Sequence, residues 1–266
     1  MERNQRGIQS VEVGGQLLVA LARHGAPMML KDLARAAGMT PAKAHPYLVS
    51  FNRLGLVEQD PVTLRYDLGP LALELGLTSL ERLDPVRVAS AAIADLAAGI
   101  DQTVALAIWG NHGPTIIRLV ESGRPVHVNL RTGTVMSPVT SATGRVFCAF
   151  LPPHRVQPAI EAELARLAAS EGDEPAPTAA QVADDLAEVR RRGMARATGR
   201  PVPSVNAFSA PVFDHAGQVA LVITAMGPAG QFNTTWDTPL CEAVRQCAAR
   251  VSQRLGWRPE AGSGPP

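Results

Sequence analysis

The chain has 266 residues, 46% of them hydrophobic, and a formal net charge of +1. It is long enough for two domains with separate cores. Its balanced charge excludes a uniformly basic surface for nucleic-acid binding, so any basic patch must be local. No run of about 18 apolar residues and no signal-type leader is found, so we expect neither membrane insertion nor secretion. The 3 cysteines are an odd number and have no metal-ligand spacing, which argues against a disulfide framework and for a reducing compartment, the cytoplasm.

The first predicted elements are helices. Apolar residues recur at helical spacing over residues 16–21 and 30–37, and Gly38 ends the second of these helices. Thr40 is a good N-cap and Pro41 suits a first helical turn. A further helix is therefore expected to begin immediately after Thr40.

A β-hairpin is predicted after these helices. Extended runs at residues 54–57 and 65–68 flank the turn-forming residues 60–63. Helix, turn, helix and hairpin together are typical of a winged helix-turn-helix, which lays its second helix in the DNA major groove. Basic side chains suit phosphates and polar ones suit base edges. The predicted DNA-contacting residues are Thr40, Lys43, His45, Tyr47, Ser50, Arg53 and Arg65.

An apolar helical run follows over residues 70–84, and we expect a linker helix that packs against a partner subunit. Asp84 and Pro85 predict the start of another helix, which Gly99 ends. Three β-like runs then predict an antiparallel meander. They are residues 103–109, 115–120 and 126–130.

The rest of the chain alternates helices with a clear hairpin. Helices are predicted at 141–151, 155–169, 179–192 and 238–255, and strands at 206–213 and 219–226. The second domain is therefore expected to be α+β, an antiparallel sheet with flanking helices gathered at one side. The predicted domains are 1–69 (DNA-binding), 70–84 (linker helix), 85–256 (effector-binding) and 257–266 (disordered tail).

Several short motifs occur at different places along the chain. They are Ile8 to Glu12, Leu33 to Gly38, Lys43 to His45, Leu54 to Glu58, Tyr66 to Gly69, Ala142 to Arg145, Ala210 to Asp214, and Gly227 with Pro228. With them the chain resembles the IclR (isocitrate-lyase-regulator) family of bacterial transcription regulators over about residues 8–255. The resemblance implies an amino-terminal winged helix and a carboxy-terminal GAF-like effector domain, with homodimers or dimers of dimers. It further implies that a small molecule sets the affinity for a double-stranded DNA operator. Taking these features together, we expect a repressor of a catabolic operon with no cofactor, metal or catalytic residue.

The ligand site is predicted at a helix start. Unpaired N–H groups there favour an anionic group, and the first candidates are Ser141, Ala142, Thr143 and Gly144. By the resemblance, the opposing wall consists of Val205, Asn206, Ala207, Thr224 and Met226. Relatives usually carry acidic residues where this chain has Arg200, whose guanidinium would pair with a carboxylic or aromatic acid. The alternatives are that Thr143 only caps, Met226 only fills the core and Arg200 is only solvated.

Pro46 stands where the family commonly has a basic residue. Proline inside a helix costs about 3 kcal/mol, so we expect a kink or a helix that begins late, near Pro46, with His45 pushed out of helical geometry. One alternative function is therefore a ligand-sensing oligomeric module with weakened or lost DNA binding. Another is an enzyme that uses Cys148, although no Cys-His or Ser-His-Asp signature accompanies it and its apolar helix face favours an inert thiol.

Overall fold

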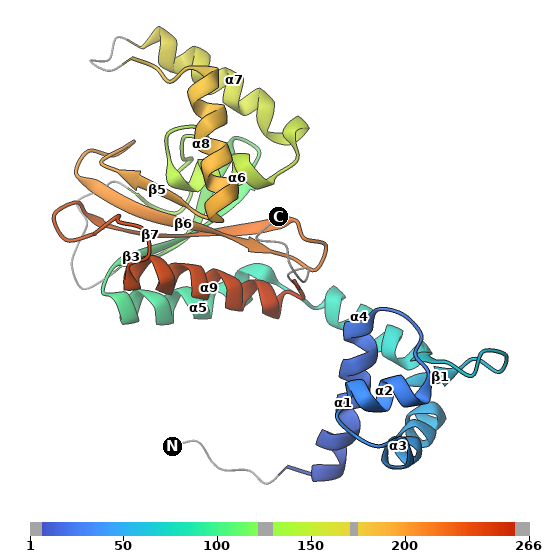
Figure 1. Cartoon of the computed structure of the whole chain (residues 1–266). Helices are drawn as coiled ribbons and strands as arrows, with labels where there is room; N and C mark the ends of the chain where they lie inside the picture. Colours follow the sequence, from blue (N-terminus) through green and yellow to red (C-terminus); the bar gives the residue numbers. More distant parts are fainter. Residues whose placement is uncertain (1–6, 122–129, 171–174, 259–266) are drawn as a thin grey trace. The chain divides into compact units, whose positions relative to one another are not determined.

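The computed structural model describes residues 7–121, 130–170 and 175–258, and the chain divides into two compact units, residues 1–83 and 84–266 (Figure 1). The first unit holds α1 (Gln9–His24), α2 (Leu30–Ala36), α3 (Pro41–Leu54), β1 (Val57–Gln59), β2 (Tyr66–Leu68) and α4 (Pro70–Glu81). The second holds α5 (Pro85–Ile100), β3 (Thr103–Gly110), β4 (Gly113–Val120), α6 (Ala142–Phe150), α7 (Pro153–Ala169), α8 (Ala179–Arg192), β5 (Ala195–Thr198), β6 (Val205–Phe213), β7 (Val219–Pro228) and α9 (Pro239–Arg254).

The first unit is a winged helix-turn-helix. Leu17 of α1, Leu33 of α2 and Leu48 of α3 are fully buried and meet in one core. Val57 and Tyr66 add side chains from β1 and β2, which pair antiparallel to form the wing. The fold class predicted for this part of the chain is confirmed, because three apolar helix faces and the base of a hairpin share one interior.

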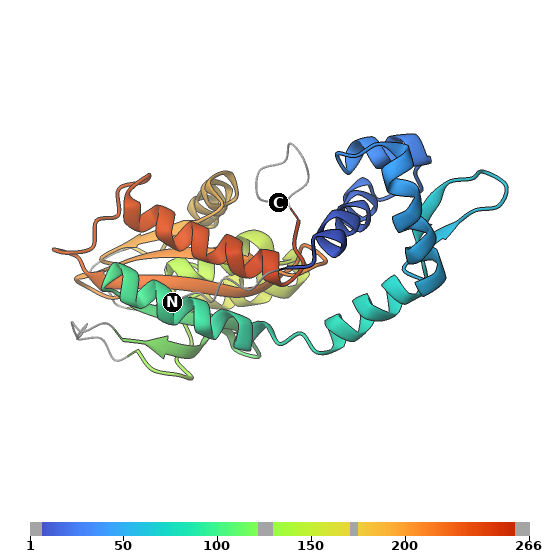
Figure 2. The same ribbon diagram turned by 90° about the horizontal axis from the view of Figure 1, so that it is seen from below.

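The second unit is built on an antiparallel sheet with the strand order β4-β3-β7-β6-β5. Ala107 and Val222 pack in a cluster with apolar residues of α6, α7 and α8. Leu106 and Ile223 are the neighbouring residues on the same two strands, so they point to the other face, which α5 and α9 cover side by side (Figure 2). The expectation that helices gather at one side was wrong. Strands that are covered on both faces have nearly continuous apolar sequences rather than alternating ones. Almost every residue of β6 and β7 is buried, as this arrangement requires.

Some element boundaries differ from those predicted. Helix α5 continues past Gly99 to Ile100, and Asp101 ends it with a left-handed φ of 49°. Helix α7 begins at Pro153 rather than near residue 155, since proline fits a first helical turn. Residues 126–129 of the third predicted β-run lie outside the described residues, as does the tail from residue 259 onward.

Strand β5 was not predicted from the sequence. It has only four residues, Ala-Arg-Ala-Thr, and alanine and arginine carry little preference for strands. It forms by pairing antiparallel with β6, where Ala195 lies opposite Ser209. The two alanines of β5 are buried, which lets α6 and α8 approach this end of the sheet.

Candidate functional site

Helix α3 is fixed at both ends by local backbone chemistry. The Thr40 hydroxyl accepts a hydrogen bond from the Lys43 N–H at 3.3 Å, and Pro41 occupies the first turn. The preceding turn passes through Gly38 at a φ of 68°, a left-handed conformation that glycine adopts without steric cost. Gly55 ends the helix in the same conformation. The predicted helix start at Thr40 is therefore confirmed.

Pro46 lies inside α3 and does not delay its start. The helix runs from Pro41 to Leu54 and includes both His45 and Pro46, so the predicted late start and the displacement of His45 were wrong. The Pro46 side chain points to solvent, where its ring has room. Its carbonyl accepts a hydrogen bond from the Ser50 hydroxyl at 3.0 Å. The caps at both ends and the buried face of α3 hold the helix together across this proline.

Most of the predicted DNA-contacting residues on α3 are exposed. Lys43, His45, Ser50 and Arg53 all lie on the solvent side. Tyr47 is the exception, because it is half-buried and packs against the core of the first unit. A contact between Tyr47 and the DNA remains a prediction, because part of its side chain already packs against the core.

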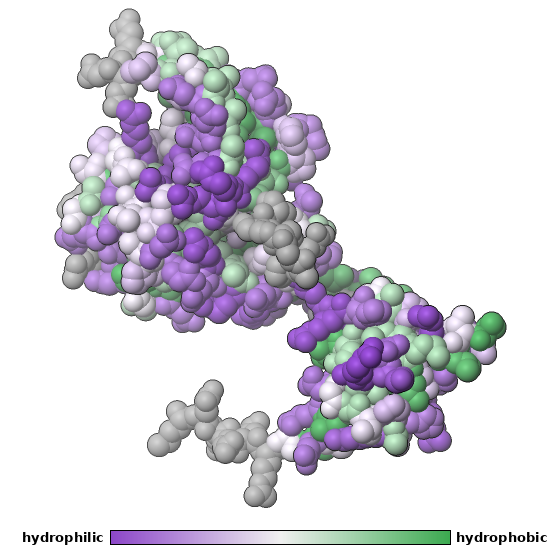
Figure 3. All heavy atoms as spheres, viewed as in Figure 1, coloured by the Kyte–Doolittle hydropathy of each residue, from purple (hydrophilic) through white to green (hydrophobic). Residues whose placement is uncertain are grey.

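The wing has a tight turn and an apolar tip. The Asp60 carboxylate accepts hydrogen bonds from the N–H groups of Val62 at 2.8 Å and Thr63 at 2.6 Å. Val62 is 87% exposed and Leu64 is 56% exposed, and the tip of this hairpin carries the green colour of hydrophobic residues in Figure 3. The predicted phosphate contact Arg65 is exposed and donates to the Pro27 carbonyl at 3.1 Å, so the wing is tied to the helical core at its base.

A buried chain of hydroxyl groups joins α6 to the sheet. The Thr143 and Thr224 hydroxyl oxygens lie 2.8 Å apart, and the Ser209 hydroxyl lies 2.7 Å from that of Thr224. The Ser141 hydroxyl accepts from the Gly144 N–H at 2.9 Å and donates to the Ser137 carbonyl at 2.6 Å. The structure thus brings Thr143 and Thr224 together, and it confirms the helix start at Ser141.

Gly144 allows the start of α6 to pack closely on the preceding loop. A Cβ atom at this position would lie 2.1 Å from the Ser137 carbonyl oxygen and 2.6 Å from the Pro138 Cα. Both neighbours are backbone atoms, which cannot move aside like a flexible side chain. The first turn of α6 is therefore held firmly in place, with Ala142 and Thr143 also buried.

The predicted opposing wall is only partly assembled. Val205, Ala207 and Met226 join the apolar cluster on the α6 face of the sheet. Asn206 points to the opposite face, because successive residues of a strand alternate. Its side-chain amide donates to the Phe232 carbonyl at 2.8 Å and its oxygen accepts from the Gly199 N–H at 3.1 Å. The structure does not bring the Asn206 side chain together with Ser141 to Gly144, and places it instead beside Gly199, the residue before Arg200.

Arg200 lines a separate cleft that the sequence did not predict. This cleft has a volume of about 650 Å³ and lies along α8 and β5. Its polar lining includes Thr140, Arg145, Thr178, Gln181, Asp185, Glu188, Arg196, Thr198, Arg200 and Trp236.

The Arg145 guanidinium lies 3.5 Å from Asp185 and donates to the Arg196 carbonyl. Burial lowers the pKa of Arg145, and the Asp185 carboxylate opposes that effect. Arg145 could have been noticed in the Ala142 to Arg145 motif, but its partners lie far along the chain.

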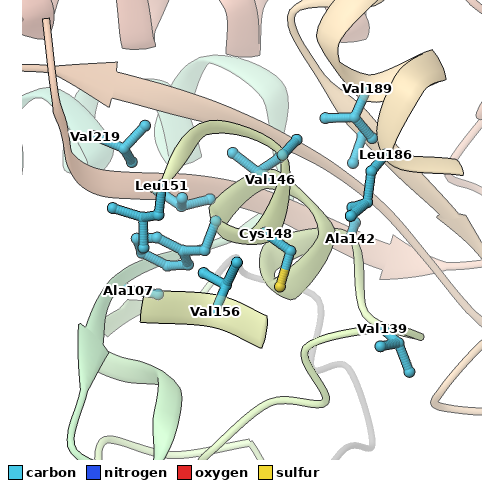
Figure 4. Close-up of a cluster of buried hydrophobic side chains, with 14 of the residues drawn as sticks. Ala107, Val139, Ala142, Val146, Cys148, Leu151, Val156, Leu186, Val189 and Val219 are labelled. Carbon is cyan, nitrogen blue, oxygen red and sulfur yellow. The ribbon is translucent and has the colours of Figure 1, made fainter. Parts of the chain in front are cut away.

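Cys148 is buried among apolar side chains that include Val146, Leu151 and Val156 (Figure 4). Burial raises the pKa of its thiol to about 12, so the nucleophilic thiolate is scarce near neutral pH.

No His, Cys, Asp and Glu side chains among the described residues form a group of three or more that could hold a metal ion. None of the helices in the described part of the chain is long and apolar enough to cross a membrane.

Two family models match this chain. Residues 10–61 match the IclR helix-turn-helix domain, and residues 77–253 match the carboxy-terminal domain of the bacterial transcriptional regulator IclR. The first match spans α1, α2, α3 and β1, and the second spans the sheet and its helices. Both parts of the fold therefore have counterparts in one family.

Individual relatives agree with the family models. The chain is 30% identical over 253 residues to the glycerol operon regulatory protein of Streptomyces griseus, which covers 94% of this chain and 98% of that protein. It is 25% identical over 236 residues to the HTH-type transcriptional regulator BhcR of Paracoccus denitrificans, covering 88% of this chain and 83% of that one. The crystal structure of Pseudomonas aeruginosa HmgR matches with a TM-score of 0.85 and 37% identity, over 94% of this chain and 99% of that one. The chain belongs to the IclR family of bacterial transcription regulators, and not to a family of enzymes.

Proposed function

We propose that this regulator binds a double-stranded, pseudo-palindromic operator and represses a catabolic operon in the cytoplasm until a small organic acid binds its second unit. The observation that carries the DNA part of the proposal is the unbroken α3 with exposed cations, Lys43 and Arg53. The proposed DNA contacts are Thr40, Lys43, His45, Ser50, Arg53 and Arg65, with Tyr47 contributing the exposed part of its side chain. Of the relatives, the Streptomyces griseus protein is named for a glycerol operon, which supports a catabolic target.

The same observation argues against lost DNA binding as the function. That alternative depended on Pro46 breaking or delaying the second helix of the helix-turn-helix motif. Because α3 is continuous through Pro46 and its polar side chains face solvent, the helix keeps the form that enters a major groove.

A second copy of the chain is proposed to cover α4. Its leucines Leu73, Leu75, Leu77 and Leu80 are 64%, 56%, 52% and 40% exposed within one chain. An exposed apolar helix of this kind marks an interaction surface. A two-fold homodimer, or a dimer of dimers, would then place two α3 helices on the two half-sites of a pseudo-palindromic operator.

The effector is proposed to be a carboxylic or aromatic acid held at the start of α6. The first main-chain N–H groups of a helix attract negative charge, and the Thr143, Ser209 and Thr224 hydroxyls add donors that rotate. The proposed ligand residues are Ser141, Ala142, Thr143, Gly144, Val205, Ala207, Thr224 and Met226, with Arg200 as a second candidate from the neighbouring cleft. The ligand changes operator affinity only if it binds the two DNA-binding arrangements differently.

Band-shift titration tests this function directly. The full chain is titrated against duplexes from the DNA that flanks its own coding sequence, at several salt concentrations and with each of a panel of small acids. We expect sequence-specific binding that weakens as salt rises, with a shallower salt slope for the Lys43→Ala variant. A small acid should release the DNA, and the Thr143→Arg variant should not respond to it. If the natural chain shows no sequence-specific binding at any salt concentration, a DNA-binding role is refuted.

A further inference from the structure

The exposed face of α3 has an apolar centre. Ala44 and Leu48 are fully buried and mark the core side of the helix. At 3.6 residues per turn, Ala42, Pro46 and Val49 lie on the opposite side. All three side chains are exposed, Val49 by 37%. The middle of the surface that faces away from the core therefore presents carbon atoms rather than hydrogen-bonding groups.

The polar groups of α3 lie around this apolar centre. Lys43 is on one flank and Arg53 is near the carboxy-terminal end of the helix. The Ser50 hydroxyl donates its proton to the Pro46 carbonyl at 3.0 Å, so that proton is used within the helix. In helix-turn-helix proteins the residues near the start of the second helix meet the base edges. The part of α3 that faces the bases therefore includes an apolar strip that begins at Ala42, with the exposed side chains of Lys43 and His45 on its flanks.

Only one base offers an apolar partner in the major groove. Thymine presents its C5-methyl group there beside its O4 acceptor, whereas the other bases present only hydrogen-bond donors and acceptors. An apolar surface against those polar edges would remove their water without supplying a partner, which is unfavourable. We propose that α3 selects thymine methyl groups through Ala42, Pro46 and Val49. This inference rests on the proposed function, because it requires α3 to be the helix in the groove.

Pro46 suits a methyl contact for two reasons. Its ring is rigid, so packing a methyl group against it costs little conformational entropy. It also has no main-chain N–H, and its side chain is exposed, so the core of the first unit makes no use of it. A residue that weakens its own helix and contributes nothing to the core is explained by a contact outside the chain.

Replacing thymine by uracil tests the contact, because uracil lacks only the methyl group. The full chain is used to select duplexes from a randomised library, and the recovered sequence is resynthesised with uracil at one thymine at a time. We expect binding about fourfold weaker at each contacted thymine, the effect of removing one buried methyl-sized group. Substitutions at thymines outside the contact should leave affinity unchanged.

Protein variants assign the contact to α3. With Val49→Ala, the uracil effect should disappear at one thymine and remain at the others, which is the coupling expected of a direct pair. Lys43→Ala is the matched control: it should weaken every duplex and leave each uracil effect intact. Circular dichroism melting of each variant checks that the exposed substitutions leave the fold unchanged.

Each other result overturns the inference in a recognisable way. Specific DNA binding without any uracil effect would refute methyl recognition and leave the proposed function standing. Uracil effects that persist in both Val49→Ala and Pro46→Ala would overturn the assignment of the methyl contacts to Val49 and Pro46. A change of molar mass in Val49→Asp without DNA would show that a second copy covers this face. If the library yields no duplex above background, the proposed function and this inference fail together.

Discussion

The Thr143 hydroxyl of α6 and the Thr224 hydroxyl of β7 lie 2.8 Å apart and share a buried hydrogen bond. Replacing Thr143 by valine keeps the shape of the side chain and removes its hydrogen-bonding atom. We expect a loss of about 1 kcal/mol, the usual net contribution of one such bond. Thermal melting should then show a transition lower by roughly 2 to 4 °C for a unit of this size.

The size of this loss depends on Thr224 keeping a second partner. Its hydroxyl also lies 2.7 Å from that of Ser209, so it is not left alone in the core. Thr132→Val, at an exposed position, is the matched control and should melt like the natural chain. Equal melting of Thr143→Val and the control would show that the bond contributes nothing to stability.

Two adjacent glycines of α1 should respond in opposite directions to alanine. A Cβ atom at Gly14 would lie 2.7 Å from Tyr47 Cδ1, whereas a Cβ atom at Gly15 would meet nothing within 4 Å. Gly15→Ala should stabilise the chain by roughly 0.5 to 1 kcal/mol, since alanine favours a helix interior. Gly14→Ala should be less stable than Gly15→Ala, because the Tyr47 ring must shift. Urea denaturation of the two variants measures the difference, and equal stability would contradict this packing.

The parts of the fold that the sequence predicted are those with local signals. Thr40 and Pro41 mark the start of α3, and Ser141 marks the start of α6, because each cap is made within a few residues. The apolar spacing of α1 and α2 is local in the same sense. These signals were sufficient for the winged helix and for most helices of the second unit.

The parts that were missed depend on contacts between distant residues. Strand β5 exists because β6 pairs with it, and its own alanines give no sign of that pairing. The strand holding Asn206 was predicted, but which face each side chain takes is decided by packing against α6 and α9. Likewise the Tyr47 ring packs against Gly14, a contact between α3 and α1 that helical spacing alone does not reveal.

Pro46→Ala should make the first unit more stable and its DNA binding weaker. Alanine restores a main-chain N–H that can donate to the Ala42 carbonyl, one turn earlier, and the gain could reach about 3 kcal/mol. The same change removes the rigid ring from the exposed face of α3. Thermal melting and band-shift titration on one preparation measure the two effects together. A variant that binds DNA as well as the natural chain would show that Pro46 makes no contact with it.

Asp60 should make the wing sensitive to acid. The pKa of its carboxyl lies below the ordinary value of 3.8, because the N–H groups of Thr63 and Val62 donate to the carboxylate. A lowered folded-state pKa means that this stabilisation is present above the unfolded-state pKa and is lost as pH falls through the folded-state value. Asp60→Ala should therefore be less stable than the natural chain near pH 6, and the difference should shrink below about pH 4.

A matched variant separates this effect from a general change in charge. Glu58 is an exposed carboxyl on β1, and Glu58→Ala removes the same negative charge from the wing without touching the turn. Chemical denaturation across the pH range measures both variants. A stability difference for Asp60→Ala that stayed constant from pH 6 to pH 2 would contradict the role given to its carboxylate.

The leucines of α4 should control assembly. Leu73, Leu77 and Leu80 follow helical spacing along one side of α4, and Leu77 is 52% exposed within a single chain. Leu77→Glu would place a charge in the proposed contact with a second copy, and we expect a lower molar mass by light scattering and weaker operator binding. Leu64→Glu is the control, because Leu64 is 56% exposed at the tip of the wing. It should keep the molar mass of the natural chain. A charge buried without a partner is strongly unfavourable, so Leu77→Glu must disrupt the contact if α4 forms it. Equal masses for both variants would therefore show that α4 is not where the copies meet.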